Sequence, residues 1–307
     1  MLMYFHRIID GCRSAEGGIP VMCTGQGVSE TAARGAVTAY ARKMEAAHVF
    51  KFESLPVSYD GEGSLDLPGL EAEEQEMFIE GLIPLPFDLC WFEATVMVQE
   101  QGHRETFGFL IEKIPAGFEV RPIRTVHMPA PVDLGGREVK EYCDFSGEIW
   151  RIVSVPGEDR LHIDATDPLG VARERAAMLG YNDSSRITGE TGFACWLILM
   201  LSSRSTSFDK VDAPAKLNKS RLLKGKAAIP AYSIVSVIPK DIAKRMRSEG
   251  DTAGDGLRSS PRLHWRRSHR RTYPNGHVVV IPRLLIGYKT HAGEDVLPTY
   301  YKVDLSV

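Results

Sequence analysis

The run LCWFEATVMVQ, residues 89–99, is rich in aromatic and β-branched residues, which favour strands. The two prolines in the preceding LIPLPFD, residues 82–88, prevent a helix there. Further strand patterns follow, with Gly-Gly and Pro-Gly turn signals between them, at residues 106–112, 118–123, 148–155 and 160–164. The sequence therefore predicts an α+β fold, built on an antiparallel sheet with flanking helices.

Four helix patterns surround these strands. Ser29 is a suitable N-cap for the first helix. Its face of Ala32, Ala33, Ala36, Ala39 and Tyr40 is predicted to turn toward the core. The second is rich in Glu, which is typical of an exposed amphipathic helix. The last is apolar all round, which is typical of a buried helix. The patterns cover residues 30–48, 70–81, 167–179 and 191–203.

The net charge of −3 over 307 residues hides a strong asymmetry. Residues 1–202 hold 17 Lys and Arg against 31 Asp and Glu, whereas residues 203–291 hold 19 against 6. These counts give net charges of −14 and +13, which indicate a polyanionic partner for the basic part or docking of that part onto the acidic body. Because the polar stretch 203–212 is predicted to be a linker, we divide the chain into an acidic α+β part, residues 1–205, and a basic β-rich part, residues 206–307. The two parts can also form one continuous domain.

Composition and apolar runs limit the class of protein. The five cysteines are scattered and form no CxxC pair, so the sequence predicts no metal site and no cofactor site. The longest apolar run, Phe193–Leu201, is about half the length that a membrane span requires. The N-terminus lacks the uninterrupted apolar stretch of a signal peptide. We therefore expect a soluble protein of a reducing cytoplasm, without membrane contact.

The strongest functional signal is LRSSPRLHWRRSHRRTYPNGHVVVIPR, residues 257–283. Five arginines, two histidines and a tryptophan fall within residues 262–271. Asn275-Gly276 is a hairpin signal, and a second strand is predicted at 277–281. We predict that the arginines lie on one arm of a β-hairpin, where every second side chain shares a face.

Arginine and lysine side chains that contact phosphates release counterions, which gives affinity without sequence readout. Aromatic residues of the same hairpin can stack on bases. The hairpin therefore predicts a nucleic-acid-binding protein without catalysis. The predicted binding residues are Lys216, Lys219, Arg221, Arg262, His264, Trp265, Arg266, Arg267, His269, Arg270 and Arg271.

Two other functions fit the same hairpin. It can dock a host protein, as an inhibitor of a host factor does, or another copy of the chain. His264 and His269 beside arginines are also the ingredients of a metal-independent ribonuclease, with histidine as general base and acid. These histidines are five residues apart, so a bulge or a helix is needed to bring them to one face. Glu93, on a presumed core strand, is interpreted as an exposed glutamate, and a buried carboxylate with a shifted pKa is the alternative.

Two segments carry a resemblance to known proteins. They are AKLNKSRLLKGKAAIPAYSIVSVIP, residues 215–239, and SSPRLHWRRSHRRTYPNGHVVVIPRLLIGY, residues 259–288. Their order resembles a group of uncharacterised proteins of tailed phages and prophages, with the pattern KLNxxR...GKxPxxxY followed by PRxHxRRGHxRRxxxGxxxWV. Residues 84–93, PLPFDLCWFE, are similar to the N-terminal half of that group. Ser268 stands where the group usually has glycine, and Val280 where it often has tryptophan. The resemblance implies a phage-encoded protein of the host cytoplasm and no particular activity.

Overall fold

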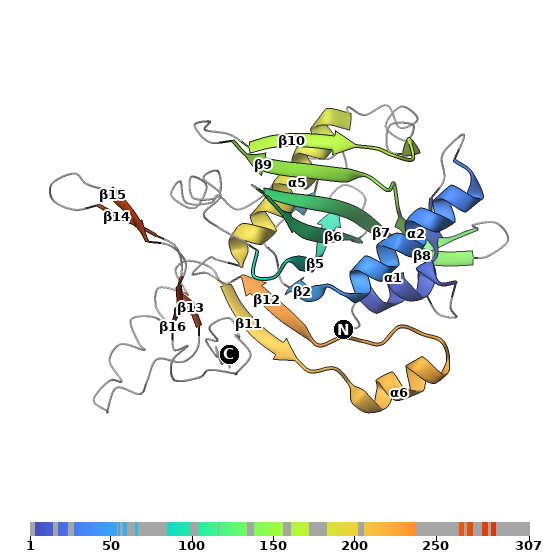
Figure 1. Cartoon of the computed structure of the whole chain (residues 1–307). Helices are drawn as coiled ribbons and strands as arrows, with labels where there is room; N and C mark the ends of the chain where they lie inside the picture. Colours follow the sequence, from blue (N-terminus) through green and yellow to red (C-terminus); the bar gives the residue numbers. More distant parts are fainter. Residues whose placement is uncertain are drawn as a thin grey trace.

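A 12-stranded sheet forms the centre of the molecule, seen in a computed structural model (Figure 1). Its main path runs β1 (Val21–Met22), β8 (Glu138–Asp144), β7 (Gly117–Asp133), β6 (Arg104–Ile114), β5 (Leu89–Val98), β2 (His48–Glu53), β12 (Tyr232–Val237) and β11 (Thr206–Val211). The structure describes residues 4–14, 18–23, 28–53, 55, 58–59, 65–66, 85–98, 104–115, 117–133, 138–155, 161–171, 183–201, 206–237, 264–266, 269–272, 278–281 and 284–286.

Four strands lie off the main path. β9 pairs with β7 and carries β10 at its outer edge, while β3 pairs with β5 and β4. These strands are β9 (Ile149–Ser154), β10 (Leu161–Thr166), β3 (Ser58–Tyr59) and β4 (Leu65–Asp66). β12, β2 and β5 run parallel to one another, whereas most of the other pairs are antiparallel. The predicted α+β class is confirmed as a mixed fold with a large, mostly antiparallel sheet.

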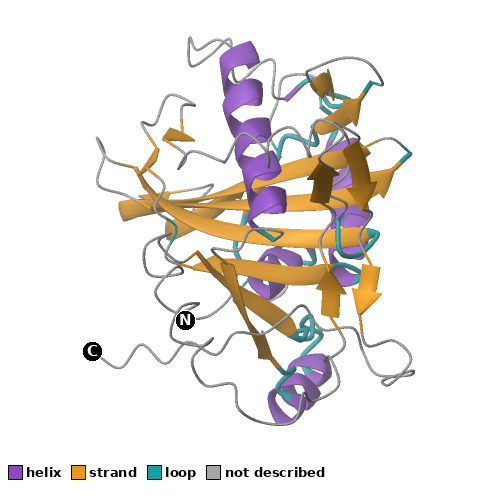
Figure 2. Cartoon of the chain, turned by 90° about the vertical axis from the view of Figure 1, so that its left-hand side faces the viewer, coloured by secondary structure: helices purple, strands orange, loops and turns teal. Residues whose placement is uncertain are grey.

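Helices cover both faces of this sheet. Helix α5 (Asp183–Met200) crosses one face, and α1 (Phe5–Cys12) and α2 (Glu30–Glu45) lie on the other (Figures 1 and 2). Strand alternation sends successive side chains to the two layers. On β5, Cys90 and Phe92 pack in the core beneath α5, whereas Trp91 packs in the core beneath α1 and α2.

The α5 layer is built from aromatic side chains. Phe193 of α5 packs edge-on against Phe107 and Phe109 of β6, with ring centroids 5.6 and 5.9 Å apart. Trp196 of the same helix is also buried, which confirms the prediction of a buried apolar helix in this region. The helix begins at Asp183, eight residues before the predicted start at Thr191.

Trp91 dominates the opposite layer. Its ring meets Phe5 of α1 and Tyr40 of α2 edge-on, at centroid distances of 5.7 and 6.4 Å. Gly108 on the neighbouring strand makes room for the indole, because a Cβ atom there would lie 2.3 Å from the Trp91 ring. The absence of a side chain at Gly108 thus allows the indole to lie flat against β6.

Helix α2 confirms its predicted start and corrects its predicted face. The Ser29 side chain accepts a hydrogen bond from the N–H of Ala32 at 3.2 Å, as an N-cap does. The helix ends at Glu45 and not at residue 48, because His48 already begins β2. The predicted face is correct for Tyr40, which is buried, and for Ala36, which packs against the core, and wrong for Ala32 and Ala39, which are exposed. The helix is instead anchored by its C-terminal half, through Tyr40, Ala41 and Met44.

The predicted linker at 203–212 is also wrong over most of its length. Residues 206–211 form β11, which pairs with β12 at the edge of the sheet. Between them the chain forms α6 (Ala215–Leu223), a short helix with no acidic residue. The sheet therefore continues across residue 206, and the division into two parts at that point stays a prediction.

Some predicted elements lie outside the described residues. These are the Glu-rich helix at 70–81 and most of the helix at 167–179. The predicted strands of the sheet are confirmed, and β7 is longer than expected because its two halves pair with different strands, β8 and β9. β8 was not predicted from its mixed polar sequence EVKEYCD.

The C-terminal segment contributes two small sheets of two strands each. β13 (His264–Arg266) pairs with β16 (Leu284–Ile286), and β14 (His269–Thr272) pairs with β15 (Val278–Ile281), both antiparallel. None of the helices that the structure describes is both long and apolar enough to cross a membrane.

Candidate functional site

The predicted basic hairpin, called the basic ribbon below, lies within residues 262–281. The structure describes its backbone where that backbone forms strands. His264, Trp265 and Arg266 lie in β13, opposite Ile286, Leu285 and Leu284. His269, Arg270 and Arg271 lie in β14, opposite Ile281, Val280 and Val279. The two histidines therefore belong to different two-stranded sheets. Arg262 and Arg267 lie outside the described residues, as do the side-chain positions on which the ribonuclease hypothesis depends.

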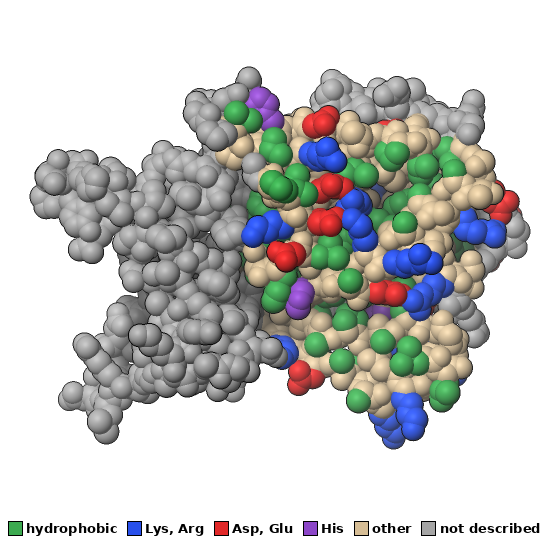
Figure 3. All heavy atoms as spheres, viewed as in Figure 1, with side chains coloured by type: hydrophobic (Ala, Val, Ile, Leu, Met, Phe, Trp, Pro, Cys, Tyr) green, Lys and Arg blue, Asp and Glu red, His purple; other side chains and the backbone are tan. Residues whose placement is uncertain are grey.

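The other predicted binding residues lie on α6. This helix stands at the end of an excursion between β11 and β12 (Figure 1) and buries none of its residues. Lys216 and Lys219 are exposed, as is Lys224 immediately after the helix. Blue spheres mark Lys and Arg side chains at this lower tip of the molecule in Figure 3. The excursion from Asp212 to Ala231 is called the α6 arm below.

Arg221 has a different environment from these lysines. Its Nη2 donates to Oδ2 of Asp10 on α1 at 2.6 Å, and its Nε donates to the carbonyl oxygen of Ala227 at 2.7 Å. Asp10 is 2% exposed, and its second oxygen accepts the N–H of Ala227 at 2.7 Å. A buried carboxylate requires this kind of full pairing. Arg221 thus anchors the α6 arm to the acidic body, and its predicted contact with nucleic acid stays a prediction.

Two more residues give the α6 arm a fixed shape. The Asn218 side chain donates to the carbonyl oxygen of Ile229 and accepts the N–H of Ile229, both at 2.7 Å. Gly225 follows the helix with φ +68°, a left-handed conformation that favours glycine. The N–H of Lys226 then reaches back to the carbonyl oxygen of Arg221 at 3.0 Å. The asparagine, arginine and glycine of the motif KLNxxR...GK therefore shape the arm, and its first lysine, Lys216, remains exposed.

His6 lies near this anchor, one helical turn before Asp10 on α1. It is buried, and the pKa of its imidazole falls from 6.5 to about 4, chiefly because of burial and then because of the positive charge of Arg221. Neutral His6 therefore adds no positive charge beside the Asp10–Arg221 pair at neutral pH.

A second group of polar residues lies within two adjacent parallel strands, β2 and β5. Lys51 and Glu93 are opposite each other on β2 and β5, and both are buried. Lys51 Nζ donates to Oε1 of Glu53 at 2.5 Å. Glu93 Oε2 accepts the N–H of Phe5 at 2.9 Å, at the first residue of α1. Glu93 therefore caps that helix, and its interpretation as an exposed glutamate is wrong.

Burial raises the pKa of the Glu93 carboxyl group. The side chain is 1% exposed, and desolvation raises its pKa above the ordinary value of 4.5, against the lowering effect of the backbone N–H groups of α1 and of Lys51. Sequence reasoning missed this because β5 is buried on both faces, so strand alternation alone does not place Glu93 in water.

His127 forms a carboxylate–imidazole–hydroxyl chain next to this group. Its Nδ1 lies 3.5 Å from Oε2 of Glu141, and its Nε2 lies 3.2 Å from Oγ1 of Thr106. Arg7 also binds Glu141, and these contacts keep the pKa of Glu141 below its ordinary value, with the hydrogen bond from His127 as the largest cause. The connectivity is that of a hydrolytic triad. Thr106 is only 2% exposed and bonds to Thr95 at 2.9 Å, so no substrate carbonyl can reach its hydroxyl.

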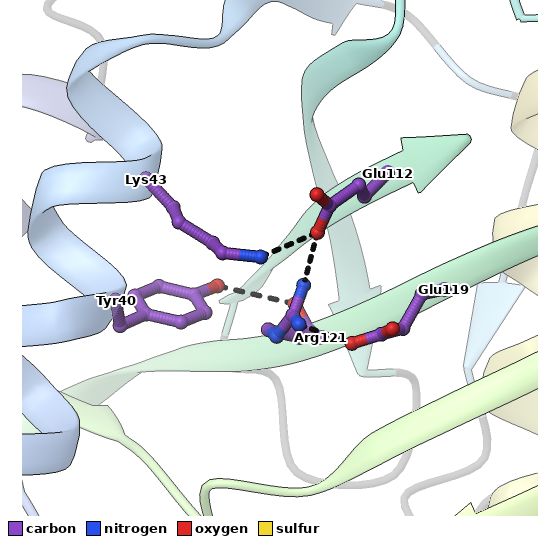
Figure 4. Close-up of polar contacts among 5 residues, drawn as sticks. All are labelled: Tyr40, Lys43, Glu112, Glu119 and Arg121. Carbon is purple, nitrogen blue, oxygen red and sulfur yellow. Dashed lines mark hydrogen bonds and ion pairs between the residues drawn. The ribbon is translucent and has the colours of Figure 1, made fainter. Parts of the chain in front are cut away.

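A third network ties α2 to the sheet (Figure 4). Lys43 and Arg121 both bind Glu112, and the Arg121 Nη1 to Glu112 Oε2 distance is 3.1 Å. Arg121 also binds Glu119, and the Tyr40 hydroxyl donates to the carbonyl oxygen of Arg121 at 3.1 Å. The hydrogen bond from Lys43 is the largest cause of a lowered pKa at Glu112. All charges in this network are paired, which indicates a structural role.

Four of the cysteines have thiols that burial keeps protonated at neutral pH. Burial raises the pKa of Cys12, Cys90 and Cys195 to about 12, and raises that of Cys143 further. In the part of the chain that the structure describes, no three His, Cys, Asp or Glu side chains are grouped so as to hold a metal ion.

Comparison with known proteins identifies no matching family model, no similar curated protein and no similar solved structure.

Proposed function

We propose that this protein binds nucleic acid, without catalysis, through its basic C-terminal part. Phosphates along the partner's backbone are the groups that its lysines and arginines contact. A partner with regularly spaced negative charges suits the net charge of +13 over residues 203–291 better than a single acidic side chain does.

The observation that carries this proposal is the state of the lysines on the α6 arm. Lys216, Lys219 and Lys224 are exposed, and α6 contains no Asp or Glu. Among the described residues, Arg221 is the one cation of this helix that pairs with a carboxylate of the acidic body, the buried Asp10. The anchoring pair thus presents the lysines to solvent in a fixed arrangement, as a phosphate-binding surface requires.

The basic ribbon, which contains β14 and β15, is the second part of the proposed interface. Antiparallel pairing of β14 with β15 is the arrangement that a hairpin over residues 269–281 requires. A two-stranded ribbon of this kind fits the major groove of DNA. We include Arg266, Arg270 and Arg271 of the ribbon, together with Arg262 and Arg267, as phosphate contacts.

Origin and location belong to the same proposal. The resemblance of residues 215–239 and 259–288 to proteins of tailed phages and prophages supports a phage-encoded protein. Such a protein meets nucleic acid in the cytoplasm of the host cell, where free cysteines stay reduced.

The proposal is tested by reversing one charge on the α6 arm and one on the body. Lys219→Glu is expected to weaken binding of a labelled DNA duplex in a fluorescence anisotropy titration, because it replaces an attraction to phosphate by a repulsion. Arg42→Glu makes the same change of charge at an exposed position of α2 and is the matched control. The proposal fails if the two variants weaken binding equally, or if the wild-type chain does not bind at about 50 mM salt.

A further inference from the structure

We propose that the C-terminal end of α6 is an apolar wedge that enters the base stack of double-stranded DNA and bends it. This inference rests on the proposed function and adds a class of partner, the duplex, and a way of deforming it. The wedge consists of Leu222 and Leu223, and the phosphates beside it are held by Lys219 and Lys224.

The first observation is the position of exposed leucines. The structure describes four exposed large apolar side chains, and three of them are on this one nine-residue helix: Leu217, Leu222 and Leu223, which are 50, 61 and 82% exposed. Exposed large apolar side chains concentrated on one short helix indicate a contact surface. Leu222 and Leu223 are adjacent at the C-terminal end of the helix.

The second observation is that side-chain contacts hold the arm in place although its helix is exposed. An isolated helix of nine residues is not stable in water. Here α6 is held by the two hydrogen bonds of Asn218, by the pairing of Arg221 with buried Asp10, and by the turn at Gly225. A side chain that separates stacked bases must be supported from behind, and these contacts supply that support.

The third observation is the charge around the leucines. Lys219 lies one turn before Leu223, Lys224 follows it directly, and α6 has no acidic residue. Proteins that bend duplex DNA insert leucine and similar side chains between base steps while basic residues bind the flanking phosphates. Single strands are bound instead by stacking on aromatic side chains, and α6 has none. The combination of leucine and lysine therefore favours a duplex.

The experiment uses the full chain and a DNA duplex of roughly 25 base pairs with a dye at each end. Energy transfer between the dyes reports bending, and a 2-aminopurine base in the duplex reports unstacking. The test variant is Leu222→Ala/Leu223→Ala, and Leu217→Ala, another exposed leucine of α6, is the matched control. Alanine keeps the helix propensity, and circular dichroism confirms that both variants fold.

We expect the wild-type chain and Leu217→Ala to bend the duplex and to raise 2-aminopurine fluorescence. The double variant should lose both signals and keep the salt dependence of binding, because its lysines are intact. Binding without bending by the wild-type chain, or bending by the double variant, overturns the wedge and leaves the proposed function standing. A wild-type chain that does not bind the duplex overturns the proposed function and the wedge together.

A second copy of the chain is the other partner that could cover the exposed leucines. Light scattering on the free protein tests for it. A monomer in all variants supports the wedge. A wild-type dimer that the double variant dissociates assigns the leucines to a self-interface and overturns the wedge.

Discussion

Glu93 is held by two opposing effects. Its carboxylate caps the N-terminus of α1 through Phe5, which favours the charged form, while its 1% exposure favours the neutral form. Burial is the larger effect, so the pKa is raised. Between the unfolded pKa and the raised folded pKa the folded chain binds more protons than the unfolded chain, and stability therefore falls as pH rises through this window.

Glu93→Gln is predicted to remove the fall in folding stability that accompanies rising pH. Glutamine keeps an oxygen that can accept the Phe5 N–H but carries no charge to desolvate. The free energy of unfolding, measured with urea at several pH values above 4.5, should fall with pH in the wild-type chain more than in the variant. If the variant is instead destabilised more at pH 7 than at lower pH, Glu93 supports the fold as an anion and the assignment is wrong.

Residue environments of this kind are only partly readable in the sequence. The N-cap at Ser29 was predictable because its partner, Ala32, is three residues away. The pairing of Asp10 with Arg221 joins residues 211 positions apart, and no local pattern indicates it. Asn218 and Gly225 belong to a motif that can be recognised in the sequence. Their structural roles still depend on the path of the chain after helix α6.

At the scale of single elements, α2 and the α6 arm each contain a glycine with open space around it. An added Cβ atom meets nothing within 4 Å at Gly35 of α2 or at Gly225 of the arm. The two positions differ in backbone conformation, since Gly35 lies inside a helix and Gly225 has φ +68°. Replacement by alanine therefore isolates the effect of the backbone.

Gly35→Ala is predicted to stabilise the protein by up to about 1 kcal/mol, because alanine loses less conformational freedom in a helix. Gly225→Ala is predicted to destabilise it by about 1 kcal/mol, because a left-handed residue with a Cβ is strained. Thermal unfolding of both variants measures the difference. Equal shifts of the same sign would contradict the assigned conformations.

Elements were predicted best where one physical signal dominates. The aromatic and β-branched run of β5 and the all-apolar end of α5 were both found from sequence. β8 was missed because EVKEYCD buries only Val139 and Cys143 among polar neighbours. β11 was taken for a linker because an edge strand has a partner on one side only and needs little apolar sequence.

At the scale of the whole molecule, the parallel group β12, β2 and β5 joins residues from both predicted parts of the chain. Such pairing depends on contacts between distant segments, which local patterns do not encode. The charge asymmetry, in contrast, was visible in composition alone. The structure adds that one arginine of the basic part is held by the body while three lysines of the same arm are exposed.

The measurement that tests the central claim most directly is the salt dependence of duplex DNA binding by the full chain. Each phosphate contact contributes about −0.9 to the slope of log K against log salt concentration, so Lys216, Lys219 and Lys224 alone predict a slope of about −2.7, and the ribbon makes it steeper. A flat dependence, or no binding at about 50 mM salt, contradicts the account.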